Sequence, residues 1–373
     1  MDRPDEGAVL DRRTLNRSLL ARQFLLERAD VQPADVQPAD VVARLLGMQA
    51  QVPLDPYVGL WSRVERFDPD AFGELLVERA LVRMTLMRST LHLVGAPEAL
   101  RMRPVLQGML ERAFASSPFA RNLAGLELEP VVQRGIELVE EEPRTTAKLR
   151  VALAREWPGY DPDSLAYAVR YLVPLVQVTP RGVWGKTLQA TFTTLDSWLG
   201  RPPAIASSVD ELVLGYLRAF GPASTADIRA WSWLNGVRAV VERLRPRLRL
   251  YRDEAGRELL DVPDGVFRDC GAPAPVRFLP QYDNVYLGHA DRSRIMDSVT
   301  WGPAFVHRGA VLVDGFIAGA WKLQRNRNEA ALAVELFARV SPSQRRELEV
   351  EAEELLAFLV PGARARRLDI SAR

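Results

Sequence analysis

The chain has few of the residues that build metal centres and disulfides. Among its 373 residues there is one cysteine, Cys270, and there are three histidines, His92, His289 and His307. One cysteine excludes an internal disulfide framework and a cysteine-cluster metal site, and three scattered histidines argue against a histidine-rich metal site. Neither a phosphate-binding loop nor a dinucleotide fingerprint occurs. The sequence therefore predicts a protein with no metal and no cofactor.

Long apolar runs are also missing. No run approaches the ~20 residues that cross a bilayer, and the polar start MDRPDEGAVLDRR lacks the features of a signal peptide. We therefore expect a cytoplasmic protein without membrane contact. The content of 47% hydrophobic and 26% charged residues is typical of a soluble globular protein. The length exceeds one simple core and indicates several modules.

An excess of one charge is absent as well. The formal net charge is +1, from 49 basic and 48 acidic residues. Proteins that bind nucleic acid mainly by charge are often strongly basic, so this balance argues mildly against such a protein but leaves room for a local basic face. Arginine greatly outnumbers lysine, which occurs only at Lys148, Lys186 and Lys322. Arginine reads phosphates and base edges well, although a GC-rich genome produces the same bias.

What is present is a pair of glutamines in the stretch MQAQVPLDPYVGLW. Gln49 and Gln51 are one residue apart, and the apolar pattern VVARLLGMQ predicts that they lie at the end of a helix before Val52 and Pro53. A glutamine amide is neutral and is not a general acid or base. It can position a water, a sugar oxygen or a base edge. The alternative is a helix-end cap or a solvent contact.

Three stretches of the chain repeat one order of elements, in which helices precede a β-hairpin. Helical periodicity and Thr-, Val- and Leu-rich runs predict these elements. They are helices at 11–28, 41–49 and 69–80 with strands in 82–94; helices at 145–157 and in DPDSLAYAVRYLVPL with strands in VQVTPRGVWGKTLQATF; and helices in SSVDELVLGYLRAF, GPASTADIRAWS and GVRAVVERLRPRL with a hairpin in RLRLYRDEAGRELLDV. This order predicts three tandem winged helix-turn-helix units, at 1–120, 121–200 and 201–270.

Two local signals accompany this order. Ser208 and Glu211 have the spacing of a capping box at the start of the third unit. The tandem repeat VQPADVQPAD at 31–40 predicts a loop, because proline disfavours helix at the residue before it, and Asp40 is then expected to cap the next helix. We expect this duplication to be peripheral.

From about Pro275 the character becomes β-rich. The runs VRFLP, VYLGH, PAFVH, AVLVDGFIAGAWKL, AALAVELFARV and ARRLDI suit strands, and SPSQRRELEVEAEELLAFLV suits a long helix. Residues 271–373 are therefore expected to form a partly closed, β-barrel-like domain with one helix packed on it. The fold class of the whole chain is α+β.

Five segments in this order resemble one known family. MQAQ, MRSTLHLV, GPASTADIRAWS, LPQYDNVYLGHADRS and VLVDGFIAGAWK together are similar to the winged-helix DNA glycosylases of the AlkZ/YcaQ superfamily, over roughly residue 11 to the end. That family is marked by Gln-Φ-Gln or Gln-Φ-Asp, where Φ is apolar. Gln49-Ala50-Gln51 matches the Gln-Φ-Gln form, as in AlkZ-like members.

The resemblance implies a fold and an activity. The expected fold is three winged-helix units plus the β-barrel-like element, C-shaped around a DNA-binding cleft. The expected activity is monofunctional hydrolysis of the N-glycosidic bond of N7-alkylguanine and related cationic alkylpurines, without lyase activity. Unhooking of interstrand crosslinks made by a genotoxic natural product, as antibiotic self-resistance, is a further expectation. The expected partner is double-stranded DNA with alkylated or crosslinked purines, bound by a monomer.

Two neutral amides suit this chemistry. N7-alkylguanine already carries a positive charge, so the base leaves as a neutral molecule with little help from a general acid. What remains is to place a water and to stabilise a sugar cation with carbonyl dipoles. We expect Gln49 and Gln51 to do this as the catalytic residues. Amides two apart on a helix diverge, but they converge if the helix ends between them.

Other polar residues are candidates for DNA contacts. Arg88 and His92 would share one face of a strand in MRSTLHLV, either toward DNA or with His92 buried inside the unit. In QYDNVYLGHADRS, the pair Asp-Asn predicts a hairpin tip, and three polar residues of this segment are further candidates for DNA contacts. They are Tyr282, Asn284 and Arg292. Lys322 and Arg325, with Arg327, form a basic cluster after the strand that ends at Trp321.

The main alternative function is a non-enzymatic, winged-helix DNA-binding transcriptional regulator, because winged helices occur often in regulators and a fold does not dictate function. A regulator would usually need a dimer and symmetric half-sites. Three units and a β-rich domain in one chain argue against it. A protein that shields alkylated DNA without cutting is a third possibility.

Overall fold

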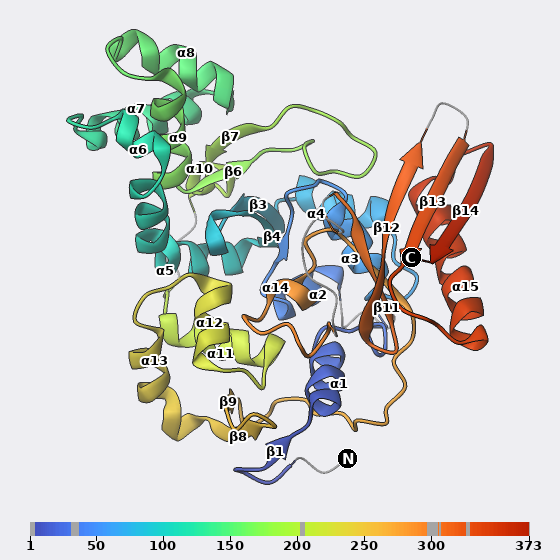
Figure 1. Cartoon of the computed structure of the whole chain (residues 1–373). Coiled ribbons are helices and arrows are strands. Elements are labelled where there is room, and N and C mark those ends of the chain that lie inside the picture. Colours follow the sequence, from blue (N-terminus) through green and yellow to red (C-terminus); the bar gives the residue numbers. More distant parts are fainter. Residues whose placement is uncertain are drawn as a thin grey trace.

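The N-terminal part combines four helices and a hairpin. A computed structural model describes residues 4–30, 37–201, 206–296, 305, 307–325 and 329–372 (Figure 1). Its first elements are β1 (Val9–Leu10), α1 (Arg12–Arg22), α2 (Pro38–Arg44), β2 (Met48–Gln49), α3 (Asp55–Trp61), α4 (Pro69–Val77), β3 (Leu81–Thr85), the 3-10 turn η1 (Met87–Ser89) and β4 (Leu91–Gly95). The predicted strand pair is confirmed, since β3 and β4 pair antiparallel.

The second stretch is mostly helical and begins with a long helix, α5, that the sequence patterns did not identify. Its elements are α5 (Ala96–Ala115), α6 (Pro118–Asn122), α7 (Leu128–Glu141), β5 (Arg144–Thr145), α8 (Thr146–Glu156), α9 (Pro162–Leu172), β6 (Leu175–Gln177), β7 (Thr191–Thr194) and α10 (Leu195–Trp198). The two predicted helices appear as α8 and α9, and the two predicted strands as β6 and β7. Thr145 caps α8 by accepting a hydrogen bond from the Lys148 backbone N–H at 3.1 Å.

The third stretch follows the predicted order of three helices and a hairpin. Its elements are α11 (Val209–Phe220), α12 (Thr225–Ser232), α13 (Val237–Leu244), the 3-10 turn η2 (Arg245–Arg247), β8 (Arg249–Asp253) and β9 (Glu258–Asp261). The capping box lies one helix later than predicted. Ser208 caps α11 alone, whereas Ser224 and Asp227 exchange backbone and side-chain hydrogen bonds at the start of α12. Asp227 takes the third helical position, which a capping box usually fills with a glutamate or glutamine.

The C-terminal stretch is an open sheet with one long helix. Its elements are β10 (Arg277–Leu279), α14 (Asn284–Leu287), β11 (Gly309–Val313), β12 (Phe316–Arg325), β13 (Glu329–Leu336), α15 (Pro342–Leu359) and β14 (Ala365–Ala372). The sheet order is β10-β11-β12-β13-β14, so it has two edges and does not close into a barrel. The expected barrel-like closure is therefore wrong. The predicted strand PAFVH lies largely outside the described residues.

Two expectations of local structure are also wrong. VYLGH is the helix α14 and not a strand, because Asp283 accepts a hydrogen bond from the Val285 backbone N–H and starts a helical turn. Asp40 is not the first cap of α2. The helix starts at Pro38 behind Gln37, and Asp40 lies inside its first turn, where its carboxylate accepts from the Gln37 backbone N–H at 2.8 Å. Residues 31–36 of the duplication lie outside the described residues.

The sheets connect the predicted units. One six-stranded sheet has the order β2-β4-β3-β6-β7-β5, so it joins the hairpin of the first unit to that of the second through the pairs Arg83–Gln177 and Met84–Val176. A three-stranded sheet, β1-β8-β9, joins the N-terminus to the third unit. Strands from different predicted units therefore pair within the same sheets, in a mixed fold of helices and open sheets. The boundaries at 120, 200 and 270 stay predictions.

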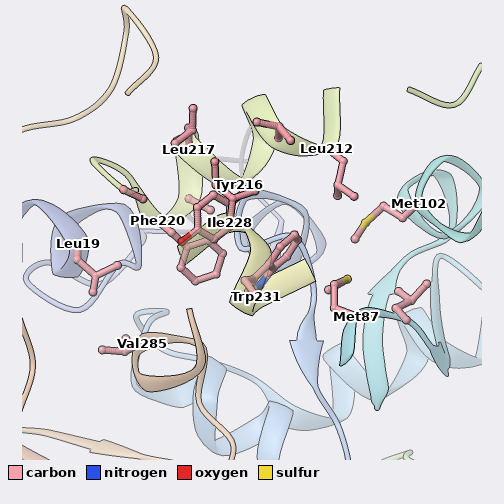
Figure 2. Packing of buried hydrophobic residues seen from close by; sticks show 14 of the residues in the cluster. Leu19, Met87, Met102, Leu212, Tyr216, Leu217, Phe220, Ile228, Trp231 and Val285 are labelled. Carbon is pink, nitrogen blue, oxygen red and sulfur yellow. The ribbon is translucent and has the colours of Figure 1, made fainter. Parts of the chain in front are cut away.

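The largest buried cluster lies where the third unit meets the first. Tyr216 and Phe220 of α11 pack against Trp231 of α12, with ring centroids 5.1 Å and 5.8 Å away (Figure 2). Met87 of η1 belongs to the same cluster. Burying these large side chains contributes on the order of 2 kcal/mol each. The cluster therefore fixes α12 against the turn that carries Arg88.

Candidate active site at the glutamine motif

Gln49 lies on the strand β2 and Gln51 in the bend after it, so neither glutamine is at a helix end. Helix α2 ends at Arg44, and the left-handed residues Leu46 (φ 56°) and Gly47 (φ 87°) reverse the chain into β2. A Cβ at Gly47 would lie 2.9 Å from the Leu93 carbonyl oxygen, so a larger residue would force the strands apart. The predicted helix end is wrong because pairing with β4 replaces the helical hydrogen bonds.

Both glutamine side chains bond to the same short segment of the chain, Arg88 to Leu91. Gln49 pairs with His92 across β2 and β4, and the Ala50 backbone N–H donates to the Leu91 carbonyl oxygen at 2.8 Å. Strand β2 ends at Gln49, and Gln51 lies in the bend that follows, with the fully buried Ala50 between them. The divergence expected on a helix does not arise.

Each glutamine carbonyl is held by one donor. Gln49 is buried, and its Oε1 accepts from Arg88 Nη2 at 2.9 Å. Gln51 is exposed, and its Oε1 accepts from the Leu91 backbone N–H at 3.3 Å. A carbonyl oxygen has two acceptor positions, so each retains one for a ligand. The two amide NH₂ groups make no hydrogen bond within the described part of the chain.

Arg88 holds Gln49 from a strained turn. The sequence predicted a strand at Arg88, and this is wrong. Arg88 lies on η1, where Arg88 and Ser89 both have positive φ (55° and 56°). Its Nη1 donates to the Trp231 carbonyl oxygen at 2.9 Å. Consecutive left-handed residues without glycine are costly and often mark functional sites. Burial, and then the charge of Arg292, lower the pKa of Arg88 to about 10.

His92 is neutral beneath Arg88. It is 1% exposed, and burial, followed by the charge of Arg88, lowers its pKa to about 3. Its Nδ1 lies 2.9 Å from the Thr90 carbonyl oxygen and its Nε2 lies 3.5 Å from Arg88 Nη2. This arrangement fits a proton on Nδ1 and an acceptor Nε2. His92 is thus a histidine hydrogen-bonded within the unit, and its direct contact with DNA stays a prediction.

Sequence reasoning missed two charged residues behind the motif. Arg83 of β3 is buried and its Nη2 donates to the Ala50 carbonyl oxygen at 2.9 Å. Asp55 opens α3, is 8% exposed, and has no hydrogen-bond partner for Oδ2 among the described residues. Burial, and then the nearby Asp283, raise the pKa of Asp55 to about 7. The one signal for Asp55 was a carboxylate inside the otherwise apolar run after Gln51.

The segment 281–292 reaches the motif from behind, but not as a hairpin tip. Asn284 is buried, and its Nδ2 donates to the carbonyl oxygens of Leu45 at 3.3 Å and Gly47 at 2.9 Å, so it clamps the turn into β2. Tyr282 is half-buried and its backbone N–H bonds to Asp55. Arg292 is half-buried and close enough to Arg88 to lower its pKa. Their DNA contacts stay predictions.

Lys322 and Arg325 lie elsewhere. Both are exposed on β12. The strand was expected to end at Trp321, but it continues to Arg325. Nothing brings them beside the glutamines, and Arg327 lies outside the described residues. Among the described residues, no group of three or more His, Cys, Asp and Glu side chains could hold a metal ion. In the same residues no helix is both long and apolar enough to span a membrane.

Comparison with known proteins agrees with this site. A family model described as DNA glycosylase AlkZ-like matches residues 42–358, which include the motif and almost all elements from α2 to α15. The chain therefore belongs to the AlkZ-like DNA glycosylase family and is a DNA glycosylase, an enzyme of DNA repair. This confirms the resemblance drawn from the five sequence segments and argues against the regulator.

A solved structure shows the same fold. The DNA glycosylase AlkZ of Streptomyces sahachiroi superposes with a TM-score of 0.69 at 20% sequence identity, over 98% of this chain and 100% of that chain. A search of curated protein sequences returned no match.

Proposed function

We propose that this DNA glycosylase removes cationic alkylpurines, chiefly N7-alkylguanine, by hydrolysis without a general acid. The carrying observation is the chemistry around Gln49. Its side-chain neighbours are Arg88, which stays protonated at neutral pH, and His92, whose pKa of about 3 keeps it neutral. Neither donates a proton to a leaving base at pH 7. A base that already carries a positive charge needs no such proton.

The two amides divide the remaining work. Arg88 occupies one acceptor position of Gln49 Oε1, and the second acceptor position and the NH₂ group contact the deoxyribose. Gln51, which is exposed and bonds to the Leu91 backbone, holds the attacking water near the anomeric carbon. Their carbonyl dipoles stabilise the positive charge that develops on the sugar. The cost of orienting the amides is met during folding and not during the reaction.

The proposal includes monofunctional cleavage. A lyase reaction proceeds through an amine that forms a Schiff base. The three lysines lie at Lys148 in α8, at Lys186 between β6 and β7, and at Lys322 in β12. The motif itself presents amides in place of an amine.

Crosslinked purines are a further proposed substrate, because a bulky adduct cannot enter a closed pocket. Gln51 is exposed beside the buried Gln49, so the motif opens to solvent on one side. An open site accepts a base that remains tethered to the opposite strand. Unhooking of such crosslinks would protect a producer of the alkylating compound. A monomer in the cytoplasm, as expected from the sequence, is part of this proposal.

The test is release of base from duplex DNA that contains N7-methylguanine. Wild type is compared with Gln49→Ala and Gln51→Ala, with thermal melts of each protein. We expect release by wild type and a loss of about 100-fold or more in each variant at similar stability, as for loss of one oxyanion donor in other enzymes. Gln133→Ala, an exposed glutamine on α7, is the matched control and should behave as wild type.

Two results would contradict the proposal. Equal release by wild type and both motif variants would place the chemistry elsewhere. Release of N3-methyladenine, 7-methylguanine and uncharged bases at equal rates would show that the positive charge of the base is not used.

A further inference from the structure

A basic surface lies around α12, and no glutamine of the motif lines it. The C-terminal half of α5, helix α12 and the turn into α13 surround an open cavity of about 990 Å³, which we name the Trp233 groove. Its lining includes Arg112 from α5, Arg229 from α12, Arg238 from α13 and Trp233 in the turn. In Figure 1 these three helices lie next to one another on the side of the molecule opposite the C-terminal sheet. The groove is therefore built by two of the predicted units.

The charge of this groove is not compensated. Arg112, Arg229 and Arg238 are all exposed, and within the described residues none of them forms an ion pair or a side-chain hydrogen bond. No acidic residue lines the groove. By contrast, Arg245, just after α13, pairs with Glu242 and Glu258. Three positive charges without carboxylates attract a polyanion.

Trp233 adds an unusual apolar contact to this charge. Its side chain is 51% exposed, and it is the one aromatic among the strongly exposed large apolar residues of the described chain. Its backbone is left-handed, with φ 57°, at the C-terminal end of α12. A bulky residue rarely adopts this conformation without a reason. The geometry keeps the indole out of the core, although Trp231, two residues earlier, is buried.

Helix α12 connects the groove to the active site. Arg88 donates to the carbonyl oxygen of Trp231, and Arg229 and Trp233 lie two residues before and after that contact. A duplex whose lesion lies at Gln49 can therefore continue along α12. Phosphates are the groups that unpaired arginines bind best.

We propose that the Trp233 groove binds the sugar–phosphate backbone of the duplex that flanks the lesion. Arg112, Arg229 and Arg238 neutralise phosphates, and the indole of Trp233 packs against a deoxyribose. The groove supplies affinity and register without reading sequence. This inference rests on DNA as the substrate of the family, and it does not depend on which lesion is removed.

The test measures binding of unmodified duplex DNA as a function of salt, by fluorescence anisotropy. The triple variant Arg112→Ala, Arg229→Ala, Arg238→Ala is compared with wild type. The control replaces Arg155, Arg339 and Arg346 by alanine, because these are also exposed and without ion pairs but lie outside the groove. Both triple variants change the net charge by the same amount.

Loss of three phosphate contacts should lower the slope of log affinity against log salt by about 3, since each contact contributes about 0.9. The control should keep the wild-type slope within about 1. An unchanged slope in the groove variant, or an equal fall in the control, would overturn the proposal. Since the duplex carries no lesion, failure of base release from N7-methylguanine would bear on the proposed substrate and leave this result intact.

Trp233→Asn separates the indole from the charges, because asparagine tolerates the left-handed backbone. We expect affinity to fall by about tenfold with an unchanged salt slope, since an apolar contact releases no counterions. Unchanged affinity would show that the indole of Trp233 makes no contact with the DNA and would overturn this part of the proposal.

Discussion

Two buried arginines of the scaffold differ in their partners from the half-buried Arg88 at the glutamine motif. In the scaffold, Arg22 pairs with Asp261 and Arg63 with Asp283, each at 2.7 Å with side-chain exposure of 1% or less on both partners. At the glutamine motif, Arg88 binds only carbonyl oxygens and lies near a neutral histidine. Arg22 and Arg63 each have a carboxylate partner within the fold, and Arg88 has none.

This difference shows where the protein accepts an energetic cost. Moving a charge out of water is unfavourable unless a partner charge compensates it. For Arg22 and Arg63 the carboxylate provides this compensation within the fold. At the site the compensation is left open, and burial lowers the pKa of Arg88 to about 10. We predict that a DNA phosphate beside Arg88 provides this compensation on binding.

The largest expected effect comes from breaking a scaffold pair. Asp283→Asn leaves Arg63 buried without a negative partner, and loss of one member of such a pair costs about 3–5 kcal/mol. We expect this decrease in the free energy of unfolding, measured by denaturant titration. Asp163→Asn, which breaks the exposed pair with Arg150, should change it by less than about 1 kcal/mol. Equal effects of the two substitutions would remove the distinction between buried and exposed pairs.

A smaller effect on stability and a clear effect on activity are expected at the site. Arg88→Met removes an uncompensated charge, so the unfolding free energy should fall by less than about 2 kcal/mol. Gln49 loses its orienting donor, and the single-turnover rate of base release at saturating enzyme should fall by about 10- to 100-fold. Arg88 is thus a positioning residue for Gln49. An unchanged rate at saturation with weaker DNA binding would assign it to binding alone.

The smallest effect concerns the pH dependence of stability. The folded state raises the pKa of Asp55 from 3.8 to about 7, so it binds the proton more tightly than the unfolded chain does. Its stabilising contribution is complete below pH 4 and is lost as pH rises through 7. Asp55→Asn should therefore stabilise the protein at pH 8 by about 1–2 kcal/mol and leave it unchanged at pH 4. Denaturant titrations at both pH values check this, and equal stability at pH 8 would contradict it.

Local patterns predicted the elements that local interactions determine. The order α11, α12, α13, β8, β9 was predicted because apolar periodicity and turn residues mark each element within its own sequence. The same is true of α8, which Thr145 caps. Strand β2 could not be predicted in this way. The run VVARLLGMQ has a helical pattern, but the β2–β4 pairing and the clamp from Asn284 come from residues more than 40 positions away.

Taken by itself, the sequence determined the family, the identity of Gln49 and Gln51 and the near absence of lysine, since these need only the order of residues. The tertiary structure decided that both glutamines bond to the segment from Arg88 to Leu91, that Arg88 holds the first of them and that Asp55 is buried. The physical reason is that burial and hydrogen bonds between distant segments set orientation and pKa, and neither is encoded in the spacing of neighbouring residues.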